Sequence, residues 1–201
     1  MSTAVTHHSL VIRPLEEVDL PAVKEFTDRA IGAGYYSTEE IRRIFEQSNF
    51  VSESGQKSML TLVLAEGRKI YGVRITYPPG KWTHGKGQGL SMKKWPHPLG
   101  KTAYFQSLFI DPEITAQGWG KKLSLKAIEA LKQIHTLGIV CHSWKESPHD
   151  SSGRYLRALG FTLVATHPEY WKEVDYECTR CGKPCHCTAE EMYLDLQKGS
   201  P

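Results

Sequence analysis

The sequence predicts one mixed α/β domain, in which helices cover both faces of a single sheet. Three observations predict it. Short runs rich in β-branched and aromatic residues alternate with stretches whose apolar residues recur at helical spacing. The chain of 201 residues, 40% hydrophobic and 23% charged, is long enough for one well-buried core. No apolar run approaches the ~20 residues of a membrane span. We therefore treat residues 1–201 as a single domain.

The first part of the chain is expected to form a strand and two helices. Residues 10–13 alternate in polarity as a half-buried strand does. Asp19 is expected to cap the first helix, with Pro21 in its first turn. Ser37 and Glu40 have the spacing of a capping box, which predicts the start of the second helix.

A hairpin and a long loop are expected next. The β-rich runs 59–65 and 70–77 are separated by a turn that contains Gly67, which favours a hairpin. Residues 78–101 follow as a loop of unusual length, either functional or a solvated connector. This loop contains four aromatic or imidazole side chains: Trp82, His84, Trp95 and His97.

The remaining elements alternate between strands and helices. A helix over 117–135 places Leu123, Ala127 and Leu131 toward the core. Ser147 or Asp150 can cap a second helix, which ends near Gly160. The strands expected in this half are 104–110, 138–144, 161–165 and 192–196.

The stretch 109–122 is the most informative part of the sequence. An apolar strand ends at Ile110, and Gly118 and Gly120 open the helix that follows. The start of a helix leaves backbone N–H groups without intrahelical partners, and glycine lets a ligand approach them closely. Lys121 and Lys122 add positive charge at the positive end of the helix dipole, so an anion such as a phosphate is expected there.

The order of strand, Asp-Pro-Glu, Gly-x-Gly and long amphipathic helix resembles motif A of the GCN5-related N-acetyltransferases. Residues 152–161, a helix that closes on Gly160-Phe161, resemble the second signature of that superfamily, and residues 10–14 are similar to its first strand. The resemblance covers roughly 9–166 and a last strand near 191–197. It implies a mostly antiparallel sheet that is splayed between its fourth and fifth strands.

The resemblance also implies a binding site for acetyl-coenzyme A. The backbone after the strand would hold the diphosphate, and the pantetheine arm would pair with the strand itself, as an added strand does. Thr115 stands where the family usually has Gln or Arg. The residues that would bind the cofactor are Leu108, Phe109, Ile110, Gln117, Gly118, Trp119, Gly120, Lys121 and Lys122.

Acetyl transfer to an amine requires a base for the amine, a group that stabilises the oxyanion and an acid for the departing thiolate. The backbone amide of Phe109 or Ile110 is expected to meet the oxyanion. Leu156 occupies the position of the family's general-acid tyrosine, so its neighbour Tyr155 becomes the acid candidate. No carboxylate lies on the strand 104–110. The candidate bases, at the end of the neighbouring strand, are Glu146 and His142.

Four cysteines lie within ten residues: Cys178, Cys181, Cys185 and Cys187. In a reducing compartment this spacing favours metal binding over disulfides. Four thiolates form a closed tetrahedral site for Zn²⁺, so a structural role is expected. His186 in place of one sulfur, free thiols and an iron–sulfur cluster are alternatives.

The cysteines belong to an insertion, 167–189, between the last two strands, where the family has a plain hairpin loop. Tyr170 and Trp171 of this insertion would line the acceptor site. Alternatively, the insertion would only stabilise the domain or an oligomer contact.

The sequence thus predicts an acetyl-CoA-dependent N-acetyltransferase that acts on a primary amine of a small molecule, peptide or protein. The alternatives are an acyl-CoA-binding module that holds a protein or RNA partner through its zinc loop, and a zinc or redox sensor. A net charge of +3 does not indicate a nucleic-acid partner. The N-terminus lacks the layout of a secretion signal, so a cytoplasmic location without membrane contact is expected. A homodimer is left open.

Overall fold

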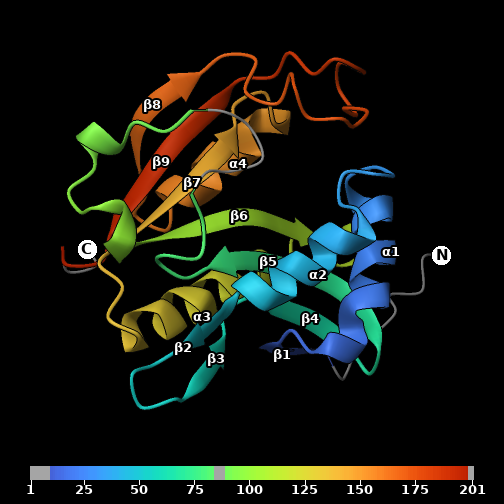
Figure 1. Cartoon of the computed structure of the whole chain (residues 1–201). Helices are drawn as coiled ribbons and strands as arrows, with labels where there is room; N and C mark the ends of the chain where they lie inside the picture. Colours follow the sequence, from blue (N-terminus) through green and yellow to red (C-terminus); the bar gives the residue numbers. More distant parts are fainter. Residues whose placement is uncertain (1–9, 84–88, 199–201) are drawn as a thin grey trace.

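The computed structural model describes residues 10–83 and 89–198, and its centre is one seven-stranded sheet (Figure 1). The strand order is β1-β4-β5-β6-β7-β9-β8, and every neighbouring pair is antiparallel except β6 and β7. The mixed, mostly antiparallel sheet that the sequence predicts is confirmed. The strands are Val11–Pro14 (β1), Leu62–Glu66 (β4), Lys69–Tyr77 (β5), Thr102–Ile110 (β6), Gly138–Trp144 (β7), Thr162–His167 (β8) and Ala189–Asp195 (β9).

Helices cover both faces of the sheet, as predicted. On one face, the α1 face, α1 (Leu20–Ala30) and α2 (Thr38–Gln47) pack on a core that includes Val73 and Ile75. On the opposite α3 face, α3 (Trp119–Gln133) and α4 (Ser151–Arg157) pack on a second core. Because each strand alternates its side chains between the two faces, Tyr104 belongs to the α1 face and Phe105 to the α3 face.

A β-bulge in β6 opens the sheet. Ile75 pairs with Ser107 and Thr76 with Phe105, so Gln106 is an extra residue on β6. Such a bulge bends its strand and increases the local twist. The parallel pairing of β6 with β7 accordingly ends at Phe105 and Cys141, while β6 continues to Ile110. The splay between the fourth and fifth strands of the sheet lies where the resemblance predicts it.

Three helix starts test the predicted caps. The capping box is confirmed: the Ser37 hydroxyl accepts the Glu40 N–H at 3.1 Å, and the Glu40 carboxylate accepts the Ser37 N–H at 2.8 Å. The prediction for Asp19 is wrong, because its buried carboxylate accepts hydrogen bonds from Arg13 instead of capping α1. At α4, the Ser147 hydroxyl accepts the Ser152 N–H at 3.0 Å, so Ser147 supplies the side-chain cap.

Two segments differ from the prediction. The expected strand 59–65 is divided: its first residue ends the short hairpin β2–β3 (Asn49–Val51 and Lys57–Met59), and β4 begins only at Leu62. The loop 78–101, where it is described, contains the 3-10 helices η2 (Met92–Lys94) and η3 (Leu99–Lys101). Trp82 and Trp95 are buried on the α1 face, so this segment is part of the core. His84 lies outside the described residues.

The cysteine-containing segment 168–188 connects β8 to β9 and lies beside the connection between α1 and α2 (Figure 1). The rings of Tyr35 and Tyr176 meet edge to face there, with their centroids 4.9 Å apart. Among the helices of the described ranges, none combines the length and the apolar character that crossing a bilayer requires.

Candidate active site and metal centre

The splay between β6 and β7 contains a cavity of about 440 Å³. β6 contributes Phe105 to Phe109, and β7 contributes Cys141, His142 and Trp144. The cavity reaches both faces of the sheet. On the α3 face it is lined by Arg74, Tyr155 and Leu156, and on the α1 face by Ile31, Tyr35, Trp171 and Tyr176. A molecule can thus contact both faces of the sheet through this one opening.

The amino end of α3 is built to expose its amides. Gly118 precedes the helix in the left-handed conformation (φ 77°), and no side chain caps the first turn. The first intrahelical bond is donated by Lys122 to Gly118 at 3.1 Å. Within the described ranges, the amides of 117–121 have no hydrogen-bond partner. No side chain of the described residues therefore occupies the predicted anion site.

The side chains of this loop interact with one another. The Lys122 ammonium lies over the Trp119 ring, 4.1 Å from its centroid, and the Trp119 indole donates to Gln117 at 3.3 Å. Gly120 packs closely on β6, since a Cβ there would lie 3.2 Å from Leu108. The close approach of Gly120 to Leu108 and Ile110 places the start of the helix against the end of β6.

Tyr155 lies at the cavity on the α3 face. Its hydroxyl donates to the carbonyl of Gly120 at 3.2 Å and hydrogen-bonds the hydroxyl of Ser124. Its neighbour Leu156 is buried in the core and also reaches the cavity wall. The structure thus places the acid candidate beside the first turns of α3.

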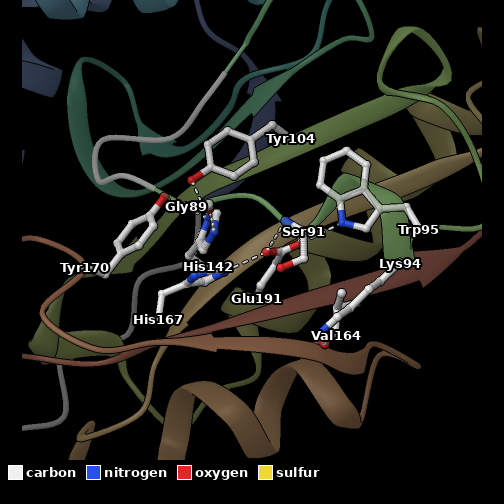
Figure 2. Close-up of polar contacts among 10 residues, drawn as sticks. All are labelled: Gly89, Ser91, Lys94, Trp95, Tyr104, His142, Val164, His167, Tyr170 and Glu191. Atoms are coloured by element: carbon white, nitrogen blue, oxygen red, sulfur yellow. Dashed lines mark hydrogen bonds and ion pairs between the residues drawn. The ribbon is translucent and has the colours of Figure 1, made fainter.

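His142 occupies the opposite side of the opening, in a network of polar residues on the α1 face (Figure 2). Its Nε2 donates to the carbonyl of Gly89 at 3.1 Å. Because that carbonyl can only accept, Nδ1 of the neutral ring is the acceptor, and it faces the hydroxyls of Tyr104 and Tyr170, each at 3.1 Å. Burial lowers the pKa of His142 to about 4, so the ring is neutral at pH 7.

The network includes a residue that sequence reasoning missed. Glu191 on β9 is fully buried, and its carboxylate accepts the Ser91 N–H at 2.9 Å, the Trp95 indole N–H at 2.6 Å and His167 Nε2 at 2.7 Å (Figure 2). A ring nitrogen of His142, a ring nitrogen of His167 and a carboxylate oxygen of Glu191 lie within 4.8 Å of one another. Glu191 directly precedes the predicted strand 192–196, and that position alone does not indicate burial or a role in a site.

Glu146, the other candidate base, is not in the cavity wall. Its carboxylate accepts the backbone N–H of Thr188 at 3.0 Å and ties the end of β7 to the residue after Cys187. Cys141 is a buried strand residue, as expected, and burial raises the pKa of its thiol to about 12.

The four predicted cysteines are brought together. The Sγ atom of Cys181 lies 3.8 Å from that of Cys185 and 3.7 Å from that of Cys187. The Sγ atoms of Cys178 and Cys187 are 3.8 Å apart. A tetrahedral site with Zn–S bonds of about 2.3 Å has sulfurs about 3.8 Å apart, so the spacing fits this ion. All four sulfurs lie within 4.8 Å of one another.

Backbone hydrogen bonds shape this cluster. The amide and carbonyl of Cys178 pair with those of Gly182, which closes the turn that carries the first two cysteines. The Tyr176 hydroxyl donates to Cys185 at 3.3 Å. The His186 ring turns away to Glu169, 2.8 Å distant, so it does not replace a sulfur.

A larger groove of about 980 Å³ lies on the α1 face. It runs between α2, residues 80–83 and the segment 170–175. Tyr35 and Gln106 line both this groove and the cavity at the splay, so the two are neighbours.

Solved structures share this architecture. The ribosomal-protein-S18-alanine N-acetyltransferase from Escherichia coli superposes with a TM-score of 0.63 at 16% identity, over 93% of this chain and 94% of that one. A GCN5-related N-acetyltransferase from Kribbella flavida gives 0.60 at 18% identity, over 94% and 98%.

An acetyltransferase described as putative, from Salmonella typhimurium with its cofactor acetyl-CoA, gives a TM-score of 0.62 at 16% identity, over 96% and 97%. No protein-family model and no curated protein matches the sequence. The chain therefore has the fold of the GCN5-related N-acetyltransferases. At these identities the likeness establishes the fold.

Proposed function

We propose that the chain is an acetyl-CoA-dependent N-acetyltransferase that moves an acetyl group directly to a primary amine. The observation that carries this proposal is the splay: the acid candidate and a neutral histidine line one cavity. Leu108, in the wall of that cavity, packs against Gly120, next to the unpaired amides at the start of α3. Structures with this fold carry the names of N-acetyltransferases, which supports the reaction class.

The amides of 117–121 would bind the diphosphate, because they lack partners in the described structure and point out of the positive end of α3. Leu108 to Ile110 would pair with the pantetheine arm, since β6 has no strand on its β7 side beyond Phe105. Acetyl-CoA supplies the thioester that is attacked.

The acceptor would enter from the α1 face through the larger groove. Its amine must lose a proton, and His142 is the candidate base, because its Nδ1 is unprotonated and faces Tyr170 and Tyr104. A proton can pass from the amine through a tyrosine hydroxyl to Nδ1. On the α3 face, Tyr155 is the candidate acid for the departing sulfur.

We also propose that Cys178, Cys181, Cys185 and Cys187 hold a structural Zn²⁺. The segment that carries them contributes Trp171 and Tyr176 to the cavity and Tyr170 to both the groove and the histidine network. The ion would therefore fix one wall of the acceptor site and act on specificity through that wall.

The test combines binding with turnover. The purified protein is titrated with coenzyme A, and acetyl-CoA is then incubated with a panel of amines and peptides while acetylated products are followed by mass spectrometry. We expect micromolar binding and a product that depends on the amine. Saturable binding without turnover of any amine would instead support a non-catalytic acyl-CoA-binding module.

A further inference from the structure

Arg74 on β5 is a buried cation without an anionic partner. It is 3% exposed and lies on the α3 face. Throughout the described ranges, no carboxylate lies within 4.0 Å of its guanidinium. Even the exposed Arg42 has a carboxylate, that of Glu17, at 3.0 Å. Since burying an unpaired charge is unfavourable, a buried arginine of this kind indicates an anion that the protein alone does not supply.

The guanidinium is held in a defined orientation. Nε donates to the Ser124 hydroxyl at 3.0 Å, Nη2 lies 3.5 Å from the Tyr155 hydroxyl, and the group stacks on the Phe105 ring at 4.2 Å. Nη1 has no hydrogen-bond partner among the described residues. Arg74 also lines the cavity at the splay, so its remaining donor capacity is available to a molecule bound there.

Its position separates it from the proposed diphosphate site. N–H groups of a helix point toward its amino end and carbonyls toward its carboxyl end. Arg74 reaches α3 through Ser124 and through Tyr155, which is bound to the carbonyl of Gly120. It therefore lies on the carbonyl side of the first turn, away from the amides. Phe105, on which it stacks, is the last residue of β6 that pairs with β7.

We infer that Arg74 binds a carboxylate at the end of the acyl group, so that the preferred donor is the coenzyme A thioester of a short dicarboxylic acid, such as a malonyl or succinyl group. This inference rests on the proposed transfer of an acyl group from coenzyme A to an amine and changes only the acyl group that is preferred. An arm that enters along β6 from the amides of α3 brings its acyl end to the inner end of the splay. The guanidinium fork is suited to bidentate binding of a carboxylate.

The transfer itself is unchanged by the longer acyl group. The amine nitrogen forms a bond to the thioester carbonyl carbon, and the carbon–sulfur bond breaks with its electron pair on sulfur. The amine proton goes to the base and the thiolate takes up a proton, which gives an amide and free coenzyme A. The distal carboxylate takes no part in these bonds and is held by Arg74.

The experiment measures the dissociation constants of coenzyme A, acetyl-CoA, malonyl-CoA and succinyl-CoA by calorimetry, for the wild type and for Arg74→Met and Arg74→Lys. We expect one dicarboxylic thioester to bind wild type at least about 10-fold more tightly than acetyl-CoA. Arg74→Met should abolish this difference and leave coenzyme A binding within about 3-fold. Arg74→Lys should retain part of it. Arg42→Met, which removes an exposed arginine of α2, is the matched control.

Three results would overturn the inference or its foundation. If wild type binds all acyl thioesters equally, the inference is overturned. This result does not depend on the Arg74 variants, whose folding melting curves would check. Equal weakening of coenzyme A and of every thioester in Arg74→Met assigns Arg74 to the diphosphate instead. If no coenzyme A derivative binds wild type, the proposed function itself fails.

Discussion

The Nδ1 atom of His142 lies 3.1 Å from the hydroxyl oxygen of Tyr170. This contact joins β7, at the centre of the sheet, to the segment that carries the four cysteines. Their rings also stack, with centroids 4.3 Å apart. The cysteine-containing segment and the candidate base are thus one structural unit, although 28 positions separate the two residues.

Replacing His142 tests its role as a base. We expect His142→Gln to lower kcat by about 100-fold, because no unprotonated imidazole nitrogen would remain at the opening. Tyr170→Phe should have a smaller effect, since Tyr104 keeps its hydroxyl at the same nitrogen. Steady-state kinetics with a saturating amine measure both. His97→Gln, which loses a contact to Asp195, is the matched control, and an unchanged kcat in His142→Gln would exclude the proposed role.

The same histidine should make stability depend on pH. Burial lowers the pKa of His142 to about 4 in the folded chain, whereas the unfolded side chain titrates near 6.5. Between these values the unfolded state binds more protons, so the free energy of unfolding falls as the pH drops from 6.5 to 4. The full difference is on the order of 3 kcal/mol. Urea unfolding across this pH range should show a weaker dependence for His142→Gln than for wild type.

Metal removal tests the cysteine centre. We expect about one zinc per chain by elemental analysis. Chelation should lower the Tm and raise the KM of the amine, while the Kd of acetyl-CoA changes little, because α3 lies on the opposite face. Cys185→Ser should lose the metal, whereas Cys141→Ala, outside the cluster, should keep it. A chelated protein with an unaltered KM for the amine would leave the ion a purely stabilising role.

Gly118 tests the anion site. Its backbone is left-handed, and an added Cβ would have no described neighbour within 4 Å, so it would point into the space before α3. Gly118→Ala should cost about 1 kcal/mol in stability through backbone strain, and should also weaken coenzyme A binding. Gly55→Ala has the same strain (φ 81°) in the β2–β3 hairpin. Calorimetry should therefore show weaker coenzyme A binding for Gly118→Ala than for Gly55→Ala. Equal coenzyme A affinities of the two variants would argue against binding at these amides.

Local patterns made much of the fold predictable. The Ser37–Glu40 box, the glycines at the start of α3 and the cysteine spacing each act within a few residues, so the sequence reveals them directly. The burial of Trp82 and Trp95 depends on contacts between distant segments of the chain, and the amino-acid composition of a loop does not reveal such contacts.

The polar groups of the site were harder to predict for the same reason. Arg74 is opposite Leu108 on a neighbouring strand, and Glu191 meets Ser91 across 100 positions. No periodicity indicates which buried strand positions hold a charge. Likewise, the bulge at Gln106 results from the register between two strands, which a single strand sequence does not encode.

That one additional residue has a thermodynamic consequence. From Ser107 to Ile110, one side of β6 has no neighbouring strand. The two parts of the sheet are therefore joined only through the four positions, 102–105, at which β6 pairs with β7. A ligand that occupies this side would complete the hydrogen bonding of the sheet as it binds. Its concentration would then enter the folding equilibrium of the whole chain, and heat resistance would rise with the supply of the donor.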